Sequence, residues 1–101
     1  MTPRSGVNGS IVPVYAADMV HNSKAKIEAL VTFVKEATSA PNNSFEVSDV
    51  KQDGSVFVRF RSSDTRSASD YADTMNQALV RAGRPFEQTT DVRLRIPLDG
   101  F

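Results

Sequence analysis

Arginines spaced two residues apart recur in two segments of this 101-residue chain. Arg59 and Arg61 stand in one segment, where Phe57 precedes them at the same spacing, and Arg93 and Arg95 stand in another. Side chains two positions apart lie on the same side of a β-strand. Four guanidinium groups and an aromatic ring on one surface could hold phosphates and stack a nucleic-acid base. The same side chains could instead form the rim of a protein interface.

Residues that commonly carry catalysis are scarce in the sequence. The single histidine, His21, lies near Asp18, and the neighbouring sequence supplies no nucleophile, base and orienting group around it, so we expect a polar residue in a loop. The absence of cysteine excludes disulfides, thiolate chemistry and cysteine metal sites. Glycine-rich phosphate loops are also absent from the sequence. We therefore expect a non-enzymatic protein with no cofactor and no metal.

Composition indicates one ordinary globular domain. The chain is 40% hydrophobic, and its twelve basic and twelve acidic residues cancel, so no global field attracts nucleic acid or an anionic membrane. No apolar run approaches the ~20 residues that a membrane helix needs. We expect residues 1–9 to form a flexible tail and residues 10–101 a single α+β domain. If the chain is complete, these features favour a cytoplasmic location or one inside a larger particle; an excised fragment could be periplasmic.

The elements that must position the arginines include a predicted hairpin. Residues 45–52 and 55–61 are two β-like runs joined by Asp53-Gly54, which suits a two-residue type I′ turn. That turn predicts a register in which Val50 lies opposite Phe57. By the same register, the pairs Ser48 with Arg59, Val47 with Phe60 and Glu46 with Arg61 also lie opposite each other.

The register assigns the hairpin side chains to two faces. The core side is predicted to carry Phe45, Val47, Val56, Val58 and Phe60, with Asp49 and Lys51 near the turn. A later strand, residues 92–98, alternates its apolar residues inward and its arginines outward. The outward set gives the candidate interaction face, which consists of Val50, Phe57, Arg59, Arg61, Arg93 and Arg95.

Two helices complete the predicted elements. Asn22 or Ser23 is expected to cap the first helix, whose apolar stripe includes Leu30 and Val34 and which Pro41 ends. The second helix is expected to start at Ser67, where Ser67 and Asp70 form a variant capping box. It is expected to stop at Gly83 and Pro85, after a stripe of Ala68, Ala72, Met75, Leu79 and Ala82.

The fold predicted from these elements is a two-layer ferredoxin-like α+β sandwich, an antiparallel sheet with two helices on one face. Two orders of elements remain open. If residues 11–15 form a strand despite Pro13, the order is βαββαβ; if instead residues 86–89 pair with the last strand, it is the permuted αββαββ.

The residues from Asp53 to Phe60 resemble the third-strand motif of RNA recognition motif domains, in which glycine, an aromatic residue, valine and phenylalanine recur at these offsets. Residues 67–82 resemble the helix that follows. The resemblance implies that Phe57 stacks on a base. The order of helix, Pro41, hairpin, helix, Phe86 and charged strand is also similar to the periplasmic assembly domains of type II secretion and type IV pilus platforms, which implies a module that dimerises without chemistry.

An exposed sheet face often carries arginines only for solubility, and an ion pair between Glu46 and Arg61 would remove one of them from the face. We therefore favour a protein-interaction or assembly module, either self-associating or docking into a larger complex through its sheet face or a strand edge. Single-stranded nucleic-acid binding through Phe57 and the arginines is the alternative.

Overall fold

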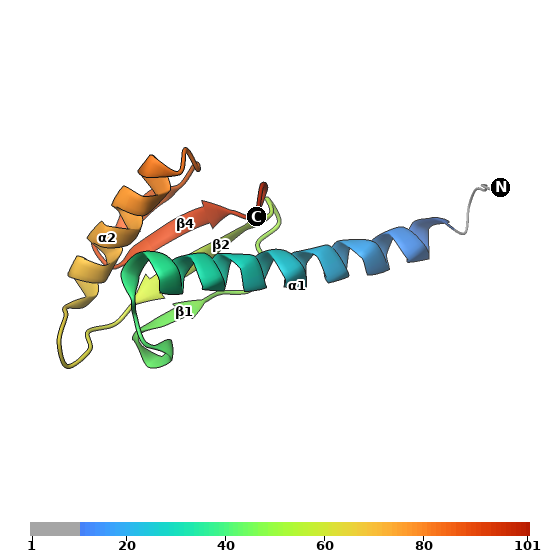
Figure 1. The fold of residues 1–101 in the computed structure, drawn as a ribbon. Coiled ribbons are helices and arrows are strands. Elements are labelled where there is room, and N and C mark those ends of the chain that lie inside the picture. Colours follow the sequence, from blue (N-terminus) through green and yellow to red (C-terminus); the bar gives the residue numbers. More distant parts are fainter. Residues whose placement is uncertain (1–10) are drawn as a thin grey trace.

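A computed structural model describes the backbone of residues 11–101 and the side chains of residues 23–101. Two helices lie on one face of a four-stranded antiparallel sheet whose strand order is β1-β2-β4-β3 (Figure 1). The elements in chain order are α1 (Ile11–Thr38), the 3-10 turn η1 (Asn42–Ser44), β1 (Phe45–Val47), β2 (Ser55–Phe60), α2 (Ala68–Arg81), β3 (Glu87–Thr90) and β4 (Arg93–Pro97). The element order is therefore αββαββ.

The first helix is longer than its sequence signals indicate. Residues 11–15 are helical, which excludes the βαββαβ order and leaves the permuted αββαββ order of the two that the sequence left open. The helix α1 runs through Asn22 and Ser23, so the cap expected at one of these residues is wrong. Pro13 is tolerated because it lies in the first turn, where backbone N–H groups have no acceptor within the helix. His21 accordingly lies within α1, not in a loop. The tail predicted for residues 1–9 lies outside the described residues.

The C-terminal end of α1 is set by a left-handed residue. Ser39 has φ +60°, and its amide donates to the Lys35 carbonyl at 2.9 Å. The hydroxyl of Thr38, which is buried, donates to the Val34 carbonyl at 2.8 Å and accepts from the Ala40 amide at 3.1 Å. The helix thus ends before Pro41 is reached. From there the chain passes through η1 into the edge strand β1.

The predicted N-cap Ser67 and the stop at Gly83 are confirmed for α2, whereas the Asp70 carboxylate, expected to complete a capping box, accepts from Arg66 instead. The Ser67 hydroxyl accepts a hydrogen bond from the Asp70 amide at 3.2 Å. At the other end Gly83 has φ +70°, and the Arg84 amide donates to the Leu79 carbonyl at 3.0 Å. This is the Schellman arrangement, which favours glycine because its left-handed backbone costs other residues more.

The hairpin reverses through three residues instead of two. The Gly54 amide donates to the Lys51 carbonyl at 3.0 Å, the Lys51 amide donates to the Ser55 carbonyl at 2.8 Å, and Gly54 has φ +82°. These features define a type I turn followed by a glycine bulge, with residues 52–54 as the loop. The two-residue turn predicted from Asp53-Gly54 is therefore wrong.

A second extra residue lies between the turn and β1. The Ser48 amide donates to the Phe57 carbonyl at 2.9 Å, and the Lys51 amide donates to the Ser55 carbonyl. Between these two bonds the first strand segment has two residues, Asp49 and Val50, and the second has one, Val56. Together the two insertions shift the register by two, and Glu46 lies opposite Arg59 rather than Arg61. A shift of two keeps every β1 side chain on its predicted face, because the side-chain period of a strand is also two.

The core lies between the sheet and the two helices. Its largest fully buried side chains include Phe60 and Leu94 from the sheet and Leu30, Tyr71 and Met75 from the helices. Phe60 stacks on Tyr71 with ring centroids 6.1 Å apart, which joins β2 to α2. No element of residues 11–101 packs on the opposite face of the sheet, which we call the outer face (Figure 1).

Candidate functional site

The outer face presents two rows of side chains that cross the sheet. In one row Arg59 on β2 lies directly opposite Arg93 on β4, with Glu46 of β1 on the far side of Arg59. In the next row Phe57 lies opposite Arg95. The strand spacing therefore brings together three of the four arginines singled out in the sequence, as predicted by their parity.

Phe57 stands at the centre of the face and is covered by two cations. The guanidinium carbon of Arg93 lies 4.8 Å from the ring centroid, and the Lys51 ammonium lies 5.7 Å from it. Both distances are within the range of cation–π attraction. These contacts leave Phe57 half-buried, although no helix covers it.

Arg95 is neutralised by acids on both sides. Its guanidinium bonds to the Asp53 carboxylate in the hairpin loop, and it lies 3.7 Å from the Glu87 carboxylate on β3. The Ser55 hydroxyl donates to the other oxygen of Asp53 at 2.6 Å. The Ser55 and Arg95 hydrogen bonds hold the pKa of the Asp53 carboxyl far below its ordinary value.

Arg61 is also paired, as the sequence predicted. It lies just beyond β2, and its guanidinium bonds to the Glu46 carboxylate at 2.5 Å. The predicted position opposite Glu46 belongs to Arg59 instead, so the ion pair runs diagonally across the strands.

Arg59 and Arg93 form no ion pair with the residues whose side chains the structure describes. Among residues 23–101, no carboxylate lies within ion-pair distance of either arginine or of Lys51. Within the same range, the Arg93 guanidinium donates a hydrogen bond to the Thr89 hydroxyl at 2.9 Å. We call Lys51, Phe57, Arg59 and Arg93 the cationic cluster. It borders a hollow of about 300 Å³ that is also lined by Glu46 and Ser48.

Val50 does not lie opposite Phe57, where the predicted register placed it. Ser48 takes the place opposite Phe57, and its hydroxyl accepts the Phe57 amide hydrogen at 2.9 Å. Val50 lies in the connection to the turn and is 36% exposed. The three-residue turn brings Lys51, which was expected on the core side, to the outer face beside Phe57. The sequence did not predict Lys51 on this face, because the side of the strand on which it lies depends on the length of the turn, and the turn is one residue longer than predicted.

No group of three or more metal-ligating side chains occurs among the described residues. Within residues 11–101, no helix combines the length and apolar character needed to cross a bilayer. The side chain of His21 lies outside the described part of the chain.

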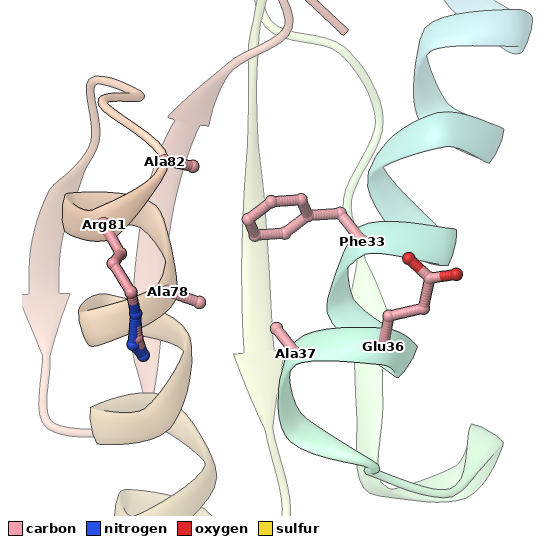
Figure 2. A pocket seen from close by; sticks show the side chains of 6 residues that line it. All are labelled: Phe33, Glu36, Ala37, Ala78, Arg81 and Ala82. Atoms are coloured by element: carbon pink, nitrogen blue, oxygen red, sulfur yellow. The ribbon is translucent and has the colours of Figure 1, made fainter.

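A second hollow, of about 440 Å³, lies between the helices (Figure 2). Phe33 extends from α1 into this space, and alanines from both helices line it. Glu36 and Arg81 stand on its two sides. Its lining therefore combines small apolar side chains and one aromatic ring with one acidic and one basic group.

Comparisons with protein-family models, with curated proteins and with solved structures give no significant match. The function is therefore inferred from the geometry and charge of the chain itself.

Proposed function

We propose that this domain is a non-catalytic docking module that holds a protein partner against the outer face of its sheet. The observation that carries the proposal is the cationic cluster. Arg93 and Lys51 cover the half-buried ring of Phe57 and Arg59 lines the same hollow, on a face that no described segment covers. No described carboxylate forms an ion pair with any of these three cations. Arginine and aromatic residues are enriched at protein interfaces and supply much of their binding energy.

The fold supports an interaction role by analogy. The αββαββ order with strand order β1-β2-β4-β3 is the arrangement obtained when the first strand of a βαββαβ domain is moved to the end of the chain. We therefore propose a permuted ferredoxin-like domain. Such folds host many functions, so the site, not the fold, has to carry the assignment.

The face is a better docking surface than either edge of the sheet. The edge strand β1 has three residues, and the other edge strand, β3, has a register irregularity between Gln88 and Thr90. Short and bulged edges resist pairing with another strand. Strand addition would therefore gain few backbone hydrogen bonds on either side.

Charge favours a different protein over a second copy at this face. A two-fold axis through the cationic cluster would bring Arg59 and Arg93 of one copy against the same arginines of the other. Like charges brought together across an interface oppose association. The partner we propose therefore presents an acidic surface.

Site-specific photocrosslinking in the native cell tests the docking proposal. A photoreactive phenylalanine at Glu46, which lines the hollow, should yield one defined protein adduct. The same group at Gln77, exposed on α2, is the control and should not yield that adduct. Adducts of equal strength from both positions, or from position 77 alone, would contradict docking at the outer face, and an adduct with a second copy would replace it by self-association.

Single-stranded nucleic-acid binding is the second candidate, because the unpaired cations and Phe57 could serve a phosphate chain and its bases. Arg93 and Lys51 already contact the ring, so a stacking base would have to displace a cation. Titration with mixed single-stranded oligonucleotides at low salt tests this candidate. It requires tight binding that weakens with salt, with a shallower salt dependence after Arg59→Gln or Arg93→Gln.

A further inference from the structure

Arg59 and Arg93 form a cross-strand pair of like charge in the middle of the sheet. They are direct partners on β2 and β4, the two central strands. Like charges directly opposite each other destabilise an antiparallel sheet. Glu46, the acid opposite Arg59, is bonded to Arg61 at 2.5 Å. The other arginines of the face have acidic partners, so this pair is an exception within a chain of zero net charge.

The pair lines two adjoining hollows. Arg59 and Arg93 border the hollow of about 300 Å³ beside Phe57. They also border a different hollow, of about 420 Å³, which residues 90–92 line on its other side. A group bound at the arginines therefore has room on both sides. Arg59 is exposed and Arg93 is half-buried, so both remain within reach of a ligand.

We infer that Arg59 and Arg93 form a receptor for a carboxylate side chain of an acidic peptide segment in the partner. This inference rests on the proposed docking function and names the chemistry of its site. A guanidinium group donates two parallel hydrogen bonds to a carboxylate, and two guanidiniums on one anion relieve their mutual repulsion. Lys51 adds a third positive charge beside the site, and Phe57 offers an apolar contact for the rest of the segment.

The acids around the site favour a single carboxylate over a phosphodiester chain. Glu46, Asp53, Glu87 and Asp91 lie on different strands and loops at the borders of the face. A polyanion that crosses the face would pass these carboxylates, and the neutral chain supplies no long-range attraction for it. A lone side-chain carboxylate bound at Arg59 and Arg93 passes fewer of these acids than a polyanion does, because Glu46 and Asp91 each line only one of the two hollows.

The test uses a blocked ten-residue peptide in which glutamate alternates with glycine and serine. Controls are the same peptide with glutamine for glutamate, a version with phosphoserine for glutamate, and a mixed single-stranded oligonucleotide. Chemical-shift titration at low salt should show binding of the glutamate peptide and little binding of the glutamine peptide. Arg59→Gln and Arg93→Gln should each weaken binding by about tenfold, the size expected for loss of one charge-assisted contact. Arg81→Gln, which removes an equal charge on α2, should not change it.

A second measurement separates a binding site from a structural one. Because Arg59→Gln removes the cross-strand repulsion, it should raise or preserve the thermal midpoint of the unliganded domain while it weakens peptide binding. Unchanged peptide binding in Arg59→Gln would overturn the inference, as would tighter binding of the phosphoserine peptide or of the oligonucleotide. If the crosslinked adduct at position 46 persists in Arg59→Gln, the carboxylate receptor fails but docking at the outer face stands.

Discussion

The backbone amide of Phe57 donates its hydrogen bond to the hydroxyl of Ser48, at 2.9 Å, and the Ser48 amide donates to the Phe57 carbonyl at the same distance. The side chain of Ser48 thus substitutes for a backbone acceptor at the point where the strand leaves the regular ladder. Beyond this point the chain accommodates its extra residue before the turn at Lys51. This pair of bonds holds Ser48 beside Phe57.

Removal of the Ser48 hydroxyl should weaken the hairpin. Ser48→Ala leaves the half-buried Phe57 amide without its acceptor, and we expect the free energy of unfolding to fall by about 1–2 kcal/mol. Ser48→Thr keeps the hydroxyl and should retain most of the stability. Urea denaturation of the three proteins measures the difference, and equal losses in both variants would show that the bond contributes little.

Phe57 and Phe60 should respond differently to truncation. Phe57→Ala loses mainly its contacts with Arg93 and Lys51, so we expect a cost of about 1 kcal/mol. Phe60, 1% exposed between sheet and α2, should cost about 3–5 kcal/mol when replaced by alanine. Partner association should weaken in Phe57→Ala with the fold retained. A loss for Phe57→Ala as large as that for Phe60→Ala would place Phe57 in the core and remove the proposed docking face.

Arg66 should stabilise the junction between the two helices. Its guanidinium donates to the Thr38 carbonyl at the end of α1 at 2.8 Å and to the Asp70 carboxylate on α2 at 2.7 Å. The same group lies 4.6 Å from the ring centroid of Tyr71. Arg66→Ala should lower the free energy of unfolding by about 1–3 kcal/mol. Arg66→Lys keeps the charge but not the planar group, so recovery of full stability by lysine would contradict this account.

Asp53 should contribute to the acid sensitivity of the domain. Hydrogen bonds from Ser55 and Arg95 depress its pKa in the folded state, whereas the unfolded chain takes up the proton near the ordinary value of about 3.9. The stability that Asp53 provides is therefore complete above that pH and declines as the pH falls below it. Asp53→Asn should make the decline in unfolding free energy below about pH 4 shallower.

Urea denaturation at a series of acidic pH values measures this effect. Asp64→Asn is the control because Asp64 is exposed and forms no ion pair among residues 23–101. It should follow the pH profile of the unmodified domain. Identical acid profiles for Asp53→Asn and the unmodified domain would show that the Asp53 network does not influence folding.

The side chains of β1 lie on their predicted faces although the predicted turn is wrong. The predicted and observed registers differ by two residues. The cross-strand neighbour of Glu46 is therefore Arg59 instead of Arg61, and Glu46 stays on the same face of the sheet. A single extra residue would have turned β1 over and placed its apolar side chains in water. Burial of Phe45, Val56 and Phe60 opposes that slip, because hydrophobic burial outweighs the preference of a two-residue turn.

Features that depend on residues close together in the chain could be predicted before the fold was known. The alternation of Val56, Val58 and Phe60 with Phe57 and Arg59 set the faces of β2, and Ser67 and Gly83 set the ends of α2, since caps and periodicity act over a few residues.

Features that depend on residues far apart in the chain could not be predicted in this way. The helical state of residues 11–15 did not follow from local signals, because Pro13 is compatible with either an edge strand or a first helical turn. The free or paired state of each arginine depends on acids that the fold brings near: Asp53 reaches Arg95 across 42 positions of the sequence, whereas no described acid reaches Arg59. The electrostatic potential at a site depends on the distances to all nearby charges, and only the folded chain sets those distances.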